Sequence, residues 1–218
     1  MRRSPRPVGR PPAEFAEDLR ARILDVAEAM VGRDGIEGFA LRECARRAGI
    51  SHGAPAHHFG DKTGLLSELA ADSFDELARA IDRRMARAGS DAMARLRAMA
   101  AAYVEYALSH RAKFQLMFRP DAIDGSRPRL ARAQEACHQR IYGAMTSALV
   151  ASGHLVDRRA PARMTHTWAT IHGFATLALD GGFGSPVWSR KPARPQPGRL
   201  VQELLDGVLD EMCRAIAG

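Results

Sequence analysis

The chain has 218 residues, with 32 lysine and arginine residues against 25 aspartate and glutamate residues, and a net charge of +7. This length allows one large domain or a small domain joined to a larger one, and we expect the second. The basic excess favours a polyanionic partner such as DNA. Three cysteines, Cys44, Cys137 and Cys213, form no C-x-x-C pair, which argues against a disulfide framework or a zinc ribbon.

The N-terminal segment, residues 1–12, contains four arginines, four prolines and no acidic residue. Such a composition cannot bury enough apolar area to fold, so we expect a disordered basic arm. The arm adds non-specific affinity for DNA or reaches the minor groove, and we favour the first alternative. No signal peptide and no membrane span is visible in the sequence, so we expect a cytoplasmic protein with no membrane partner.

Apolar residues recur at steps of three and four along most of the remaining chain, which is the spacing of an amphipathic helix. The first set runs from Leu19 to Met30 and is followed by Asp34-Gly35, a typical helix end. Five further sets begin at Phe74, Met93, Leu130, Met164 and Val201. No alternating strand pattern competes with them, so the predicted fold is all-α. A proline-rich connector, residues 181–198, is expected before the last helix.

The segment RRAGISHGAPAHHF, residues 46–59, combines three histidines, two glycines and a proline. Helical metal ligands need a spacing of three or four residues, whereas His57 and His58 are adjacent and His52 lies five residues before His57. A nucleophilic role for Ser51 lacks the G-x-S-x-G elbow and the strand that carries it. We therefore expect no metal, no cofactor and no catalytic residue.

The neighbouring sequence predicts a helix-turn-helix instead. LRECARRA, residues 41–48, forms a short helix with a small apolar face, and Gly49-Ile50-Ser51 forms a turn before a second short helix that ends at Phe59. Ser51 is expected to cap this second helix. Pro55 would then fall at the fourth helical position, where its ring clashes, so we predict an irregular or late start with Pro55 in the first turn.

From Leu19 to Leu66 the chain resembles the tetracycline-repressor (TetR) family of bacterial transcriptional regulators. The resemblance rests on the helix that ends at Asp34-Gly35, then LRECARRAGIS, then HHF followed by DKTGLL. It implies a homodimer with a three-helix DNA-binding domain (13–62), an effector-binding and dimerisation domain (63–218), and about nine helices in total. WATIHG, residues 168–173, resembles the Trp-His-Gly signature of one C-terminal subgroup. Ala56 departs from the family pattern, which often has a phosphate-contacting tyrosine there.

The second helix of the motif is expected to enter the major groove of DNA. Small residues near its start allow close approach of the backbone, and its histidines are candidates for base-edge or phosphate contact, while flanking cations grip phosphates without reading sequence. The predicted DNA-binding residues are Arg42, Ser51, His52, Gly53, Ala54, His57 and Lys62. Arg46 and Arg47 either join them or form a solvated helix face. His58 and Phe59 are expected to pack the core of the motif.

The middle helices are expected to enclose a small-molecule effector, because large and partly polar residues gather there. The candidates are Tyr103, Tyr106, Phe114, Met117, Phe118, Met145, Trp168 and His172. Each of them could instead be ordinary core, as apolar residues at helical spacing usually are. His172 is of special interest, since an unpaired imidazole in an apolar helix is costly.

The last two helices are expected to form the dimer interface as a four-helix bundle, because their seams are rich in alanine and glycine. The candidates are Met164, Trp168, Ile171, Ala175, Val201, Leu205, Val208 and Met212, some of which also serve the intrachain core. The resulting prediction is a homodimeric repressor on a palindromic operator, released when an effector tilts the helix from Lys62 to Met85. The alternatives are an architectural DNA-binding protein without effector and, less favoured, a metal-dependent hydrolase.

Overall fold

The computed structural model describes residues 13–154, 158–184 and 197–217. The predicted basic arm and most of the proline-rich connector lie outside these ranges. Within them the chain forms nine α-helices, one 3₁₀ turn and no strand, so the all-α prediction is confirmed. The helices are α1 (Ala13–Asp34), α2 (Leu41–Ala48), α3 (Ala54–Phe59), α4 (Lys62–Arg87), α5 (Ala92–Ser109), α6 (Arg111–Met117), α7 (Pro128–Ala151), α8 (Ala160–Leu179) and α9 (Pro197–Ala217), with the 3₁₀ turn at Gly182–Gly184.

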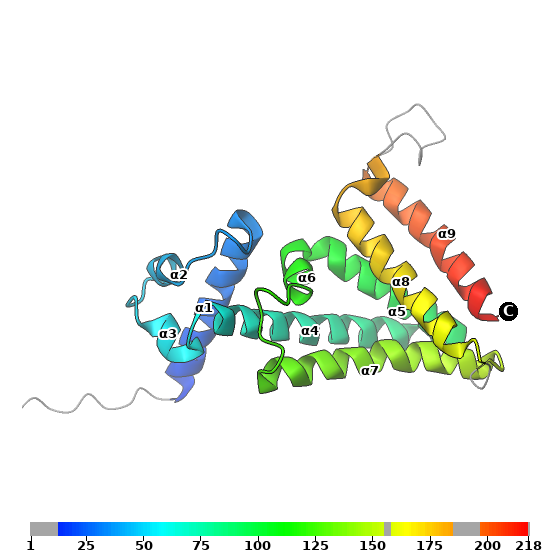
Figure 1. The fold of residues 1–218 in the computed structure, drawn as a ribbon, viewed down its shortest axis with the longest axis horizontal. Coiled ribbons are helices and arrows are strands. Elements are labelled where there is room, and N and C mark those ends of the chain that lie inside the picture. Colours follow the sequence, from blue (N-terminus) through cyan, green and yellow to red (C-terminus); the bar gives the residue numbers. More distant parts are fainter. Residues whose placement is uncertain (1–12, 155–157, 185–196, 218) are drawn as a thin grey trace, which may run out of the picture.

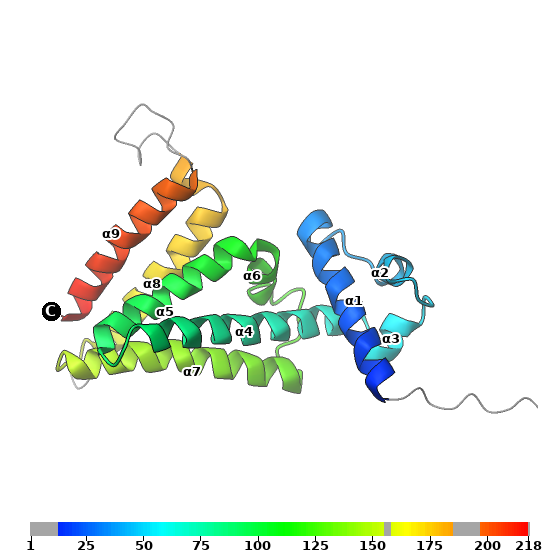
Figure 2. The same cartoon turned by 180° about the vertical axis from the view of Figure 1, so that it is seen from behind.

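The helices form an elongated arrangement in which α1, α2 and α3 gather at one end (Figure 1). Helix α4 begins beside α3 and runs along the length of the molecule with α7 at its side, and α8 and α9 lie toward the opposite end (Figure 2). With 26 residues, α4 is about 39 Å long at 1.5 Å per residue. One helix therefore connects the helix-turn-helix to the distal part of the larger domain.

Short-range signals set the helix ends. Gly35 and Gly49 follow α1 and α2 with φ values of 73° and 63°, a left-handed conformation that glycine adopts without strain. Helix α4 begins at an N-cap, where Asp61 Oδ1 accepts a hydrogen bond from the backbone N–H of Gly64 at 2.6 Å. Asp91 caps α5 in the same way at 2.7 Å from Ala94 N.

The core is centred on α4, which packs against α5, α6 and α7. Its apolar residues recur at helical spacing and are nearly inaccessible to solvent, with Leu65, Leu66 and Ile81 at 0% exposure and Phe74 at 2%. A helix covered on so many sides must carry an apolar surface wider than one stripe. This burial fixes α4 as the axis around which the other helices are placed.

Gly64 marks a close approach between the end of α3 and the first turn of α4. A Cβ atom at this position would lie 1.9 Å from the carbonyl oxygen of Phe59, a backbone atom that cannot move away alone. Only glycine permits this contact. The short connection thereby fixes how α3 sits on the start of α4.

Candidate nucleic-acid interface and effector cleft

The helix-turn-helix is present, but its second helix begins later than a Ser51 cap would require. Helix α3 starts at Ala54 with Gly53 as its N-cap residue, and no side chain caps it. The prediction that Ser51 caps the helix is therefore wrong, and the turn spans residues 49–53 rather than three or four residues. Pro55 lies in the first turn, as predicted, because its missing N–H has no helical acceptor there.

The outer face of the motif is accessible, and its inner face is packed. Ser51, His52, Gly53 and His57 are exposed, and Ala54 is half-buried. On the inner side of α2, Cys44, Ala45 and Ala48 are buried at 0 to 1% exposure. The predicted groove-facing residues of α3 and of the turn before it are thus exposed or partly exposed, and the motif lies at one end of the molecule (Figure 1).

Phe59 holds the back of α3 against the rest of the motif. It is 4% exposed, and the guanidinium of Arg20 in α1 lies over its ring at 5.5 Å from the centroid. His58 is half-buried beside it, with 6.2 Å between the two ring centroids. Both residues pack against the motif, as expected, and leave the opposite side of α3 free.

The flanking cations differ in what they contact. Arg42, at the start of α2, is exposed. Lys62 is half-buried, and its Nζ donates a hydrogen bond to the carbonyl of Ile36 at 3.0 Å, which leaves two of its three N–H donors for another acceptor. Arg42 is therefore the less constrained of the two predicted phosphate contacts.

Arg46 and Arg47 are held by acidic side chains of the motif itself. Arg46 binds the carboxylate of Glu43 through two hydrogen bonds of 2.7 and 2.8 Å, and Arg47 donates to the same carboxylate at 2.6 Å. Hydrogen bonds from Arg46 and then Arg47 lower the pKa of Glu43 to about 2. Of the two predicted roles, these contacts fit a solvated helix face better than a DNA contact.

Five of the eight predicted effector-binding residues form one aromatic cluster, which joins α5, α6 and α8. The hydroxyl of Tyr103 and Nδ1 of His172 form a hydrogen bond of 2.9 Å. Trp168 stacks on His172 with 5.6 Å between ring centroids, and Phe118 approaches the same ring to 4.6 Å. Phe114 contacts Tyr103 edge-on at 5.3 Å. The imidazole is therefore paired, and burial lowers the pKa of His172.

The other three candidates lie elsewhere. Tyr106 faces away from the cluster, since it stacks on His110 at 4.5 Å and donates to Glu76 Oε2 at 3.2 Å. Met117 and Met145 are 4% and 0% exposed and belong to the hydrophobic core. Apolar periodicity could not separate these core positions from cluster positions.

A cleft of about 910 Å³ opens beside the aromatic cluster, between α1, α6 and α8. Phe114, Phe118 and His172 contribute to its wall, and Val31 and Ile36 line it from the helix-turn-helix side. Its volume is that of a small-molecule site. A ligand in this cleft would contact α1 directly as well as the larger domain.

The predicted dimer residues divide into two groups. Ile171, Ala175, Leu205 and Met212 are 0 to 2% exposed within the single chain, so their side chains are not available to a partner. Met164, Trp168, Val201 and Val208 are half-buried against the same core. The periodic apolar residues of α8 and α9 therefore mark mainly the faces that pack inside one chain.

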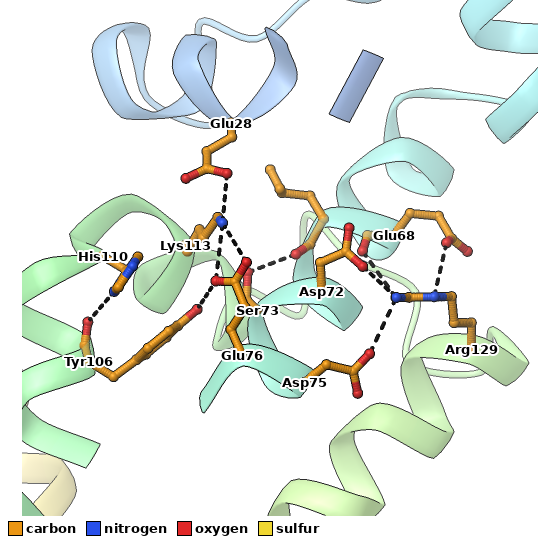
Figure 3. Close-up of polar contacts among 11 residues, drawn as sticks. Glu28, Glu68, Asp72, Ser73, Asp75, Glu76, Tyr106, His110, Lys113 and Arg129 are labelled. Atoms are coloured by element: carbon orange, nitrogen blue, oxygen red, sulfur yellow. Dashed lines mark hydrogen bonds and ion pairs between the residues drawn. The ribbon is translucent and has the colours of Figure 1, made fainter. Parts of the chain in front are cut away.

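Sequence reasoning missed a network of charges that joins α1 to the larger domain (Figure 3). Lys113 in α6 has a side chain only 9% exposed, and its Nζ lies 2.6 Å from Glu28 Oε2 in α1 and 3.0 Å from Glu76 Oε1 in α4. Burial alone would lower the pKa of Lys113, but the two carboxylates more than offset this and raise it. The available signal was a lysine at the start of the largely apolar stretch KFQLMF, residues 113–118.

A second part of the network centres on Arg129 in α7. Its guanidinium pairs with Asp72 and lies 3.3 Å from Asp75 and 3.6 Å from Glu68, all on α4. Glu68 also pairs with Arg20 of α1. Two separate ionic links thus tie α1 to the helices around α4.

In the described ranges, no group of three or more histidine, cysteine, aspartate or glutamate side chains could hold a metal ion. The free cysteines Cys44 and Cys137 are buried, and Cys213 is half-buried. None of the helices in the part of the chain that the structure describes is long and apolar enough to span a membrane.

Comparison with known proteins finds a matching family model for each of the two parts of the chain. Residues 23–69 match the family described as bacterial regulatory proteins, tetR family, and residues 96–208 match the tetracyclin repressor-like C-terminal domain. The C-terminal match does not confirm the Trp-His-Gly subgroup. The HTH-type transcriptional regulator BetI of Paraburkholderia xenovorans (strain LB400) is 32% identical over 134 residues, which cover 61% of this chain and 68% of that protein.

Solved structures give the same result. A protein of unknown function from Rhodococcus sp. RHA1 superposes with a TM-score of 0.70 at 31% identity, covering 95% of this chain and 98% of that chain. PfmR, a TetR family transcriptional regulator from Thermus thermophilus, superposes with a TM-score of 0.60 over 87% of this chain and 97% of that chain, where 17% identity supports the fold alone. The chain therefore belongs to the tetR family of bacterial regulatory proteins and is a DNA-binding transcriptional regulator, not an enzyme.

Proposed function

We propose that this regulator is a homodimeric cytoplasmic repressor that binds a palindromic operator through α3 and leaves it when a small molecule binds. The observation that carries the proposal is the exposure of His57 on α3 and of His52 in the turn before it, while Phe59 anchors α3 from behind. A helix held from behind, with small and polar residues in front, can lie in a major groove. Residues 13–62 act as the DNA-binding domain and residues 63–218 as the effector-binding and dimerisation domain.

The exposed side of α8 and α9 is the proposed dimer interface, in place of the buried seams. Ala162, Ala169 and Leu177 are exposed along α8, with Leu177 at 50%. Gly173 of α8 and Gly207 of α9 have no atom within 4 Å of where a Cβ would stand, which leaves room for a partner helix. Dimerisation there would present two α3 helices to half-sites about 34 Å apart, one helical turn of DNA.

The cleft between α1, α6 and α8 is the proposed effector site. A ligand there would press on α1 and on the loop after it while also contacting His172 and Phe118 of the aromatic cluster. It can shift the orientation of the helix-turn-helix only if it binds one arrangement more tightly than the other. A coupling free energy of about 1–3 kcal/mol would weaken DNA binding about 5- to 150-fold.

Selection of bound duplexes from a random pool tests the proposal, followed by a small-molecule screen for release of the selected site. We expect an inverted repeat, bound by two chains, and at least one compound that lowers the affinity for it. Phe118→Ala should abolish the response to that compound without abolishing DNA binding. Selection of no sequence at all would contradict the proposed operator binding, and a response unchanged in Phe118→Ala would contradict the proposed effector site.

A further inference from the structure

A second cavity, distinct from the effector cleft, has an excess of positive charge. It is a groove of about 850 Å³ between α4, α5 and α9, and it contains neither His172 nor the other members of the aromatic cluster. Five arginines line it, against three acidic residues. The arginines are Arg79, Arg83, Arg84, Arg87 and Arg97, and the acidic residues are Glu76, Glu105 and Asp206.

The three carboxylates already have partners, so they do not compensate all five cations. Glu105 pairs with Arg84. Asp206 lies 3.8 Å from Arg97, which also pairs with Asp210 outside the groove wall. Glu76 binds Lys113 at 3.0 Å and accepts from Tyr106 at 3.2 Å, as Figure 3 shows.

Arg83 and Arg87 remain without a counter-ion. Both are exposed, and neither side chain forms a hydrogen bond or ion pair with another residue in the described ranges. They lie four residues apart on α4, a spacing at which like charges face each other and repel. Arg79 lies one step earlier on the same stripe and also borders a small cavity lined by Asp72 and Asp75, both of which pair with Arg129.

The position of this arginine groove excludes a share in the proposed operator contact. Arg83 lies 21 residues after Lys62 on the same helix, which at 1.5 Å per residue places it about 30 Å from the start of α4. Figure 1 shows the distal half of α4 directed away from α1, α2 and α3. The uncompensated charge therefore lies far from the helix-turn-helix, at a place that the proposed operator contact does not use.

We propose that the arginine groove binds a small molecule with several phosphate or carboxylate groups. Guanidinium groups bind both anions through paired N–H donors. Arg83 and Arg87 are about 6 Å apart along the helix axis, which suits neighbouring charges on one compact polyanion. His110, which follows α5, and Gln202 of α9 are exposed polar residues that also line the groove. Ser109 and His110 border both the groove and the effector cleft, whereas Arg83 and Arg87 line the groove alone.

Isothermal titration of the full chain with inorganic triphosphate, citrate and acetate tests the proposal without DNA. We expect saturable binding of triphosphate, citrate or both, and no saturable binding of acetate; the comparison of the first two identifies the anionic group that the groove prefers. In Arg83→Gln/Arg87→Gln the affinity should fall at least about tenfold, since each charge-assisted hydrogen bond contributes strongly. The matched control Arg132→Gln/Arg158→Gln removes two exposed arginine charges outside the groove and should change the affinity less than about twofold.

Three results would overturn the proposal: no saturable binding of either polyanion, an equal loss in both double variants, or a loss of random-duplex affinity in Arg83→Gln/Arg87→Gln alone. The last would make the groove part of a nucleic-acid surface. Both double variants change only exposed side chains, and unaltered circular dichroism and melting temperature should confirm that they fold. Operator binding by the ligand-free protein is measured separately, so the failure of this proposal and that of the proposed repressor function remain distinguishable.

Discussion

Replacing Lys113 by methionine removes the ammonium that joins Glu28 of α1 to Glu76 of α4, at nearly constant side-chain volume. Breaking a fully buried ion pair costs about 3–5 kcal/mol, and losing an exposed one costs about 0–1 kcal/mol. Lys113 is 9% exposed, but Glu28 and Glu76 retain 42% and 31% exposure and can regain water. The free energy of unfolding should therefore fall by about 2 kcal/mol, which for a chain of this size lowers the melting temperature by about 4–8 °C.

Thermal unfolding measures this loss at one fixed protein concentration, because the proposed dimerisation would make the melting temperature concentration-dependent. Arg140→Met is the matched control. It breaks another inter-helix pair, with Asp82 at 2.7 Å, whose side chains are 36% and 49% exposed. That variant should lose about 1 kcal/mol at most. Hydrogen exchange should also accelerate in α1 of Lys113→Met, and equal stability losses in the two variants, or unchanged protection of α1, would refute the reasoning.

Two further predictions concern packing and pH. Gly64→Ala should lower the free energy of unfolding by about 1–3 kcal/mol, because the new Cβ meets the Phe59 carbonyl. Gly143→Ala on α7, where a Cβ meets nothing within 4 Å, should raise the free energy of unfolding by up to about 1 kcal/mol. Denaturant titrations of both variants measure these changes, and a stabilised Gly64→Ala variant would contradict the close approach at Gly64. Burial lowers the pKa of His138 and His172 below the ordinary 6.5, so the unfolded chain takes up protons first and stability should fall as the pH drops from 7.5 to 5.5. The melting temperature of His138→Gln/His172→Gln should fall less over this pH interval. A fall equal to that of the unchanged chain would show that these two histidines do not cause the loss of stability.

The local signals in the sequence were sufficient for the helix-turn-helix and for every described helix except α6. Glycine after α1 and α2, an aspartate before α4 and apolar residues at steps of three and four are properties of contiguous segments, and each acts over one or two turns. The late start of α3, with Pro55 in its first turn, followed from the proline in the sequence, whereas the predicted cap at Ser51 was wrong because the helix begins at Ala54.

Contacts between helices that are distant in the sequence could not be predicted from such local signals. Periodicity shows which face of α8 and α9 is apolar, but it does not show whether that face meets the chain's own core or a partner. Here it is the core that buries Ile171 and Leu205. The pairing of Lys113 with Glu28 spans residues 85 positions apart, and only the placement of α6 against α1 brings them together. The same placement of α6 against α1 determines which side chains line the proposed effector cleft.

In the proposed complex, the exposed side of α3 and the turn before it contact the bases of DNA. Fluorescence anisotropy with the selected operator tests it most directly, using His52→Ala/His57→Ala and, as control, Gln139→Ala on the exposed side of α7. A specific base contact contributes about 1–3 kcal/mol, so the double variant should bind at least about tenfold more weakly at unchanged melting temperature, while the control binds as tightly as the unchanged chain. Full operator affinity in the double variant would contradict the account.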